Sequence, residues 1–131
     1  MVQPLLQLVG VTKTYPGVTA LGGVDLDLHR GEVLGLIGEN GAGKSTLVKI
    51  LGGVTQPSSG MIRIDGVERG GLTVGEAIVA GIAIVHQELN LFDNLDVAAN
   101  VLLGREPRRG GPLRLIDRAA LQARVRPILD R

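Results

Sequence analysis

The sequence predicts an α/β fold that combines two kinds of strand with intervening helices. Residues 24–28 alternate strictly between apolar and polar side chains, the pattern of a strand with one buried face and one face in water. Residues 33–37 and 82–85 are apolar throughout, which is typical of strands that a parallel sheet buries on both faces. Segments in which apolar residues recur at helical spacing lie between and after these strands, so both types of element are expected.

Length and composition limit the class of protein. The chain has 131 residues, which is the length of one ordinary domain. Hydrophobic residues make up 44% of it and its net charge is +1, so it is too apolar and too nearly neutral to be a disordered chain. The longest uncharged apolar run, residues 77–85, is far shorter than the roughly 18 residues of a membrane span. The first residues have no basic stretch followed by an apolar one, so we expect no secretory signal. The absence of cysteine excludes disulfides, thiolate zinc sites and cysteine nucleophiles.

Turn residues place the remaining strands. Residues 5–11 are a weaker strand candidate, with a less regular alternation. Residues 61–64 and 67–68 are predicted to form a hairpin, because the Asp65-Gly66 pair between them supplies the positive φ angles of a tight turn.

Helical spacing predicts four helices, at residues 44–51, about 74–80, 95–103 and from about 117 to 126. Asp117 is a candidate N-cap of the last helix, and Pro127 is expected to end or kink it. Residues 104–131 are basic, with eight basic and three acidic side chains. A basic segment can bind nucleic acid, but this one has no aromatic residue for stacking, so we interpret it as a solvated helix face and expect no nucleic-acid partner.

Residues 38–46 carry the most specific motif of the chain, a glycine, four residues, then glycine, lysine and a hydroxyl residue. The stretch reads Gly38-Glu39-Asn40-Gly41-Ala42-Gly43-Lys44-Ser45-Thr46. Glycines allow the backbone to form a concave nest of N–H groups for phosphate oxygens, and the helix that follows adds the positive end of its dipole. The dinucleotide pattern of three glycines does not fit, because Thr46 stands where its third glycine would be.

The motif predicts which residues bind a nucleoside triphosphate and Mg²⁺. Lys44 is expected to reach the β and γ phosphates, the Ser45 hydroxyl to coordinate the Mg²⁺ ion, and Thr46 to make a further phosphate contact. The backbone that surrounds the phosphates is predicted to come from Gly38, Asn40, Gly41, Ala42 and Gly43. The structural alternative is a glycine-rich turn with an incidental lysine.

Several further stretches resemble the ATP-binding subunits of ABC-type importers for ribose-like monosaccharides. Besides the loop at 38–46, the resemblance rests on Leu-Gly-Gly at 51–53, Pro-Ser-Ser-Gly at 57–60 and Gly-Ile-Ala-Ile-Val-His-Gln-Glu-Leu-Asn-Leu at 81–91. It extends from about Leu5 to about Glu106. It implies the P-loop NTPase core of an ABC ATPase with an N-terminal antiparallel β subdomain, truncated before the helical signature region is complete. The expected division is an ATP-binding part at residues 1–104 and the start of a helical subdomain at 105–131.

The resemblance also implies roles for two residues outside the loop. Tyr15 is expected to stack on adenine, a role that suits a flat, polarisable ring, although it can also be a surface tyrosine packed beside Pro16. Gln87 is expected to approach Mg²⁺ and the attacking water, which would make it catalytic together with Lys44; the alternative is an ordinary polar residue at the end of a strand. The implied cofactors are ATP and Mg²⁺. The implied partners are transmembrane permease subunits and a second ATPase domain at the cytoplasmic face of the inner membrane, with no direct binding of sugar.

The chain departs from the family pattern in two ways. Asp96 and Ala99 stand where relatives usually have serine and glutamate. The 131 residues also contain neither a second acidic centre for hydrolysis nor the Leu-Ser-Gly-Gly-Gln signature. We therefore expect the front part of a longer ATPase, unable to hydrolyse ATP by itself, in which residues 33–37 lack a neighbouring strand. A non-hydrolysing nucleotide-binding remnant and a small P-loop phosphotransferase are the alternatives.

Overall fold

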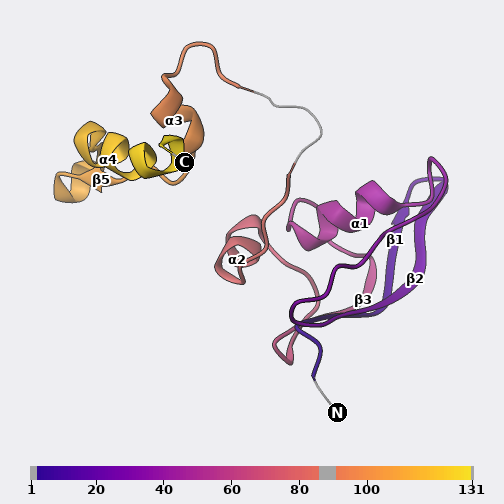
Figure 1. Cartoon of the computed structure of the whole chain (residues 1–131). Coiled ribbons are helices and arrows are strands. Elements are labelled where there is room, and N and C mark those ends of the chain that lie inside the picture. Colours follow the sequence, from indigo (N-terminus) through magenta and orange to yellow (C-terminus); the bar gives the residue numbers. More distant parts are fainter. Residues whose placement is uncertain (1–2, 86–90, 131) are drawn as a thin grey trace. The chain divides into compact units, whose positions relative to one another are not determined.

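The computed structural model of the chain describes residues 3–85 and 91–130 (Figure 1). It contains two compact units, Met1–Val85 and His86–Arg131. The boundary that the sequence predicts at residue 104 stays a prediction. In the described residues, no helix combines the length and the hydropathy that a membrane span requires.

The first unit is built on an antiparallel sheet, as the alternating pattern predicts. Its strands are β1 (Leu6–Tyr15), β2 (Val18–Leu28), β3 (Ser59–Ile64) and β4 (Val67–Arg69), in the order β2-β1-β3-β4. The hairpin predicted around residues 61–68 is confirmed, with Asp65 and Gly66 both at positive φ between β3 and β4. β1 and β2 are longer than predicted, because register shifts in their pairing interrupt the alternation on which the prediction depended.

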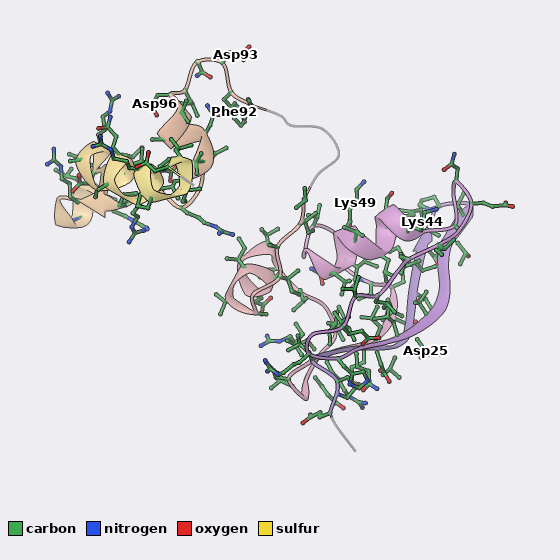
Figure 2. The ribbon with its side chains drawn as sticks, viewed as in Figure 1. Asp25, Lys44, Lys49, Phe92, Asp93 and Asp96 are labelled. Atoms are coloured by element: carbon green, nitrogen blue, oxygen red, sulfur yellow. The ribbon has the colours of Figure 1, made fainter. Side chains whose placement is uncertain are left out.

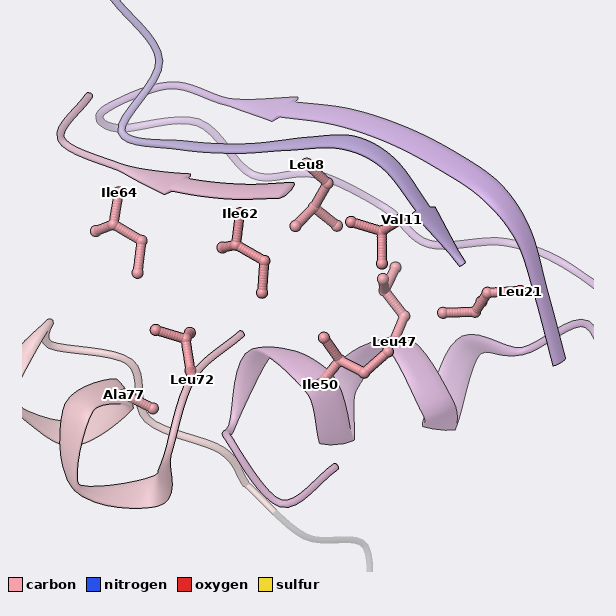
Figure 3. Packing of buried hydrophobic residues seen from close by; sticks show 9 residues of the cluster. All are labelled: Leu8, Val11, Leu21, Leu47, Ile50, Ile62, Ile64, Leu72 and Ala77. Atoms are coloured by element: carbon pink, nitrogen blue, oxygen red, sulfur yellow. The ribbon is translucent and has the colours of Figure 1, made fainter. Parts of the chain in front are cut away.

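Two helices pack on this sheet, at the places that helical spacing predicts. α1 (Lys44–Leu51) buries Leu47 and Ile50, and α2 (Val74–Val79) buries Ala77. Figure 3 shows Leu47 and Ile50 facing side chains of the sheet, and Ala77 beside Leu72. The hydrophobic core comprises Leu8, Val11, Leu21, Leu47, Ile50, Ile62, Ile64, Leu72 and Ala77. The core therefore fixes the orientation of α1 against the sheet, and with it the position of the loop that precedes α1.

The prediction of buried parallel strands at residues 33–37 and 82–85 is wrong for this structure. Neither segment is a strand, and Val33, Ile37 and Val85 are 96%, 98% and 94% exposed. Ile82 alone of these residues packs against the core from a partly buried position. An apolar segment becomes a strand only where neighbouring strands satisfy its backbone groups, and among the described residues none pairs with these segments. The expectation that residues 33–37 lack a neighbouring strand agrees with this sheet order.

The second unit is a small helical unit with a short hairpin. Its elements are α3 (Val97–Val101), β5 (Arg108–Arg109), the 3₁₀ turn η1 (Gly111–Leu113), β6 (Leu115–Ile116) and α4 (Arg118–Leu129). α3 is shorter than the predicted 95–103 because Asp96 caps it and the chain turns after Val101. Asp117 caps α4 as predicted.

Pro127 does not end α4, so the first of the two outcomes predicted for it, an end or a kink, is wrong. The helix continues to Leu129, and the amide of Asp130 still donates to the Arg126 carbonyl at 3.1 Å. Pro127 lies in the last turn, where its missing N–H removes one hydrogen bond and few residues follow. Upstream, the buried Leu121 and Val125 anchor the helix. A proline in this position is therefore tolerated.

Candidate functional site: the glycine-rich loop before α1

The glycine-rich loop at residues 38–46 runs directly into α1. Gly43 is the N-cap of the helix, with φ of 86°, and the Leu47 amide donates to its carbonyl at 2.9 Å. Gly41 also has a positive φ of 88°, and the Ala42 amide donates to the Glu39 carbonyl at 3.2 Å. Positive φ is a conformation that glycine adopts without the steric penalty of a Cβ. The glycine spacing therefore produces a tight loop at a helix N-terminus.

The start of α1 differs from that of the other helices. α2, α3 and α4 each have a side-chain cap, in which Thr73, Asp96 or Asp117 accepts a hydrogen bond from a backbone amide of the first turn. No side chain caps α1 in the described residues. The first amides of a helix carry partial positive charge and need an acceptor. The beginning of α1 thus offers donors to an anion.

Lys44 adds a full positive charge at the same place. Figure 2 shows Lys44 at the start of α1. Its ammonium group donates to the carbonyl oxygens of Gly38 at 2.5 Å and Glu39 at 2.7 Å, across the loop. A Cβ placed on Gly38 would lie 3.2 Å from that of Ala42 and 3.9 Å from the ammonium nitrogen. The charge is therefore held against the backbone that the motif predicts to surround phosphates.

The loop is also fixed against the sheet. A Cβ placed on Gly43 would overlap the carbonyl oxygen of Ala20 in β2 and lie 2.6 Å from Leu21 Cδ2. Leu21 is part of the core. The absence of a side chain at Gly43 therefore allows the loop to pack closely on β2.

Three polar residues of the predicted binding site differ in exposure. Asn40 and Ser45 are exposed and Thr46 is half-buried. Among the described residues, no three His, Asp or Glu side chains are close enough together to hold a metal ion by themselves. The Ser45 hydroxyl suits a Mg²⁺ ion whose other ligands are phosphate oxygens and water, which is how Mg²⁺ is commonly bound in nucleotide sites.

The two predicted residues outside the loop are Tyr15 and Gln87, and the structure describes only Tyr15. Tyr15 ends β1, pairs with Val18 across the turn to β2, and is 41% exposed. Lys13, which the sequence analysis did not select, places its ammonium nitrogen 5.1 Å from the centroid of the Tyr15 ring. Its position two residues earlier on the same strand is the signal that could have drawn attention to it. Gln87 lies outside the described residues.

Two carboxyl groups in the described residues have lowered pKa values, and neither belongs to the loop. Hydrogen bonds from the backbone and side chain of Thr73 lower the pKa of Glu76, and the nearby charge of Arg69 acts in the same direction. A hydrogen bond from the Gly104 backbone lowers the pKa of Glu106. A lowered pKa keeps a carboxylate ionised, so neither group is suited to donate a proton near neutral pH. The Glu76 shift reflects the capping of α2, and the Glu106 shift reflects a hydrogen bond within a turn.

The comparison with known families decides the assignment. Residues 21–131 match the family model described as ABC transporter. The chain belongs to this family. The match includes the loop at 38–46, α1 and the whole second unit. It confirms the resemblance to ABC ATPases on which the expected fold class was based.

Curated relatives in the ABC family include sugar-import proteins. A ribose import ATP-binding protein of Jannaschia sp. (strain CCS1) is 50% identical over 98% of this chain. An arabinose import ATP-binding protein of Azospirillum brasilense is 49% identical over 98% of the chain. The aligned region is 24% of each relative, so the chain spans about a quarter of the length of the curated proteins it matches.

Solved structures of ABC cassettes share the fold. One is a dimeric ATP-binding cassette in a post-hydrolysis state bound to ADP and Pi, with a TM-score of 0.70 and 29% identity over 95% of this chain and 56% of that chain. A nucleotide-free cassette from an ABC transporter has a TM-score of 0.71 and 26% identity over 85% of this chain and 44% of that chain. The predicted fold class, an ABC ATPase core with an antiparallel β subdomain, is therefore confirmed.

Proposed function

We propose that the loop at residues 38–46 binds the triphosphate of Mg-ATP. The observation that carries the proposal is the position of Lys44: its ammonium lies over a glycine-rich loop, at the start of a helix that no described side chain caps. Backbone donors, a helix dipole and a fixed cation all favour a polyanion. Membership of the ABC transporter family supports the same ligand.

Each predicted residue has a role in this proposal. Lys44 contacts the β and γ phosphates, and the backbone from Gly38 to Gly43 surrounds them. Ser45 supplies a hydroxyl ligand to Mg²⁺, and Thr46 donates to a phosphate. When bound, Mg²⁺ neutralises charge on the phosphate oxygens. Outside the loop, the proposed role of Tyr15 is to stack on the adenine base, and that of Gln87 is to act on Mg²⁺ and the attacking water.

The parent activity that we propose is the ATPase that energises a monosaccharide importer. The names of the most similar curated proteins support this process, since they are import ATP-binding proteins for ribose and arabinose. The proposal includes permease subunits in the membrane and a second ATPase domain as partners, at the cytoplasmic face of the membrane. We propose no direct contact between this chain and the sugar.

We further propose that the 131 residues alone bind ATP without hydrolysing it. Hydrolysis requires an acidic group that polarises the attacking water, and the sequence has no suitable aspartate-glutamate pair after a buried strand. A small phosphotransferase built on the same loop is the competing function. It would transfer phosphate to an acceptor other than water, which an acceptor screen detects.

Isothermal titration calorimetry with Mg-ATP tests the proposal. The chain is expected to bind, and Lys44→Ala is expected to weaken binding by at least about tenfold, since a hydrogen bond to a charged group contributes about 1.5–3 kcal/mol. Lys49→Ala is the matched control, because Lys49 is an exposed lysine on the same helix (Figure 2). A folded chain that gives no heat with Mg-ATP contradicts the proposal. Phosphate release by the chain, lost in Lys44→Ala, contradicts only the absence of hydrolysis.

A further inference from the structure

Lys13 and Tyr15 form a cation–π pair at the end of β1. The Lys13 ammonium nitrogen lies 5.1 Å from the centroid of the Tyr15 ring, within the range of such interactions. The two residues project from the same face of the strand because they are two positions apart. One face of the only tyrosine in the chain is therefore covered by a positive charge.

The Lys13 ammonium is held in place by a second interaction. It donates to the carbonyl oxygen of Gln56 at 2.8 Å. The side chain of Gln56 in turn donates to the carbonyl of Leu72 at 2.6 Å, and Leu72 is a fully buried core residue. The carbonyl that fixes Lys13 is thus tied to the core rather than to a free loop.

Further hydrogen bonds attach this segment to β1. The Ser58 amide donates to the Thr12 carbonyl at 2.9 Å, and the Thr14 amide donates to the Ser58 hydroxyl at 3.0 Å. The Thr12 and Ser59 hydroxyl groups lie 2.7 Å apart. Hydrogen bonds therefore join β1 to residues 58–59 on both sides of Lys13, which restricts the movement of the ammonium group over the Tyr15 ring.

We propose that Lys13 is a positioning residue that prepares Tyr15 to stack on a purine base. This inference rests on the proposed function, in which Tyr15 contacts adenine. The ammonium covers one face of the ring and limits its rotation, so the base stacks on the opposite face. A ring that is held before binding loses less entropy on binding, which increases affinity for ligands that carry a base. Inorganic triphosphate has no base and gains nothing from Lys13.

Lys13→Met tests the inference, because methionine keeps an apolar chain of similar length and removes the charge. Since an exposed cation–π pair is worth about 0.5–1 kcal/mol, Mg-ATP is expected to bind about two- to fivefold more weakly. The affinity for Mg-bound inorganic triphosphate is expected to stay the same. Lys13→Arg keeps a cation over the ring and is expected to restore the affinity for Mg-ATP. Lys49→Met is the matched control for removal of an exposed lysine.

Tyrosine fluorescence gives a direct readout of the ring. The chain has one tyrosine and no tryptophan, so its emission comes from Tyr15. Stacking on adenine is expected to quench this emission, with a midpoint that moves two- to fivefold in Lys13→Met and not in Lys13→Arg. Inorganic triphosphate is expected to produce no such quenching.

The outcomes separate this inference from the proposed function. Equal Mg-ATP affinity in the wild type and Lys13→Met overturns the role of Lys13 and leaves the proposed function standing. Equal losses for Mg-ATP and inorganic triphosphate also overturn it, because Lys13 would then act through the fold. If the wild type binds neither ligand, the proposed function fails and the inference fails with it. Weaker binding of Mg-ATP but not of inorganic triphosphate in Lys13→Met, with the affinity restored in Lys13→Arg, supports both the proposed function and the role of Lys13.

Discussion

Gly43 lies against Ala20 so closely that a Cβ on Gly43 would overlap the Ala20 carbonyl oxygen. Gly43 is the last residue of the loop before α1, and Ala20 belongs to β2. One close approach therefore joins the antiparallel sheet to the start of the helix. The same glycine has positive φ, so both the backbone conformation and the available space disfavour any side chain here.

Gly43→Ala is expected to destabilise the first unit more than Gly41→Ala. Both glycines have similar positive φ, which costs an alanine about 1–2 kcal/mol. Only at Gly43 does the new Cβ meet backbone and Leu21, whereas at Gly41 nothing lies within 4 Å. Urea denaturation of the two variants measures the difference. Equal losses of stability would show that the approach to Ala20 does not constrain the loop.

The sequence predicts the loop and the helix that follows it because their signal is local. Glycine spacing, Lys44 and the apolar residues of the next helix together require a loop that enters a helix, and the structure has this arrangement. The contact between Gly43 and Ala20 was not predictable, since it depends on how β2 pairs and where its register shifts. The wrong prediction at residues 33–37 has a similar cause. Apolar composition indicates which residues favour burial, but not whether partner strands are present to cover them.

Ile50→Ala and Ile37→Ala compare the same chemical change at a buried and an exposed position. Ile50 is 0% exposed in the core and Ile37 is 98% exposed. We expect Ile50→Ala to lower the free energy of unfolding by about 2–5 kcal/mol, and Ile37→Ala to change it by less than about 0.5 kcal/mol. Thermal and urea denaturation provide the measurement. A large loss in Ile37→Ala would mean that residues 33–37 pack in solution as a buried strand.

The capping box of α2 predicts a pH dependence. The backbone amide and hydroxyl of Thr73 each donate to the Glu76 carboxylate at 2.8 Å, and the pKa of Glu76 is lowered below its usual 4.5. A group whose pKa is lower in the folded state stabilises the fold above its unfolded pKa, and this contribution is lost as the pH falls through the folded pKa. The free energy of unfolding of the wild type relative to Glu76→Gln is therefore expected to be constant near neutral pH and to decrease as the pH falls below about 4.5.

Thr73→Val is the companion variant for this pH dependence. Valine keeps the shape of threonine but removes the hydroxyl that donates to Glu76 and accepts from the Glu76 amide at 3.2 Å. The pKa of Glu76, followed by NMR of its carboxyl carbon, is expected to rise toward its usual value. Loss of the N-cap is expected to cost about 1 kcal/mol at neutral pH. An unchanged pKa of Glu76 in Thr73→Val would contradict the contribution assigned to the Thr73 hydroxyl and leave that of the Thr73 backbone amide.

Asn100 holds the segment that leads into α3, and its removal should loosen that segment. Its side-chain oxygen accepts from the Phe92 amide at 2.8 Å, and its amide group donates to the carbonyls of Phe92, Leu95 and Asp96 at 3.0–3.1 Å. In Asn100→Ala the Phe92 amide loses its acceptor. A net contribution of about 1 kcal/mol for one hydrogen bond corresponds to about fivefold faster hydrogen exchange.

Asn94→Ala is the matched control for Asn100, because it removes an exposed asparagine from the same segment. Hydrogen exchange by NMR compares the Phe92 amide in both variants with that in the wild type. We expect faster exchange at Phe92 in Asn100→Ala alone, while the amides of α4 between Leu121 and Val125 keep their protection because their side chains are buried. Protection lost throughout α4 would instead mean that Asn100 stabilises the whole unit. Unchanged exchange at Phe92 would mean that the hydrogen bonds of Asn100 do not order the segment in solution.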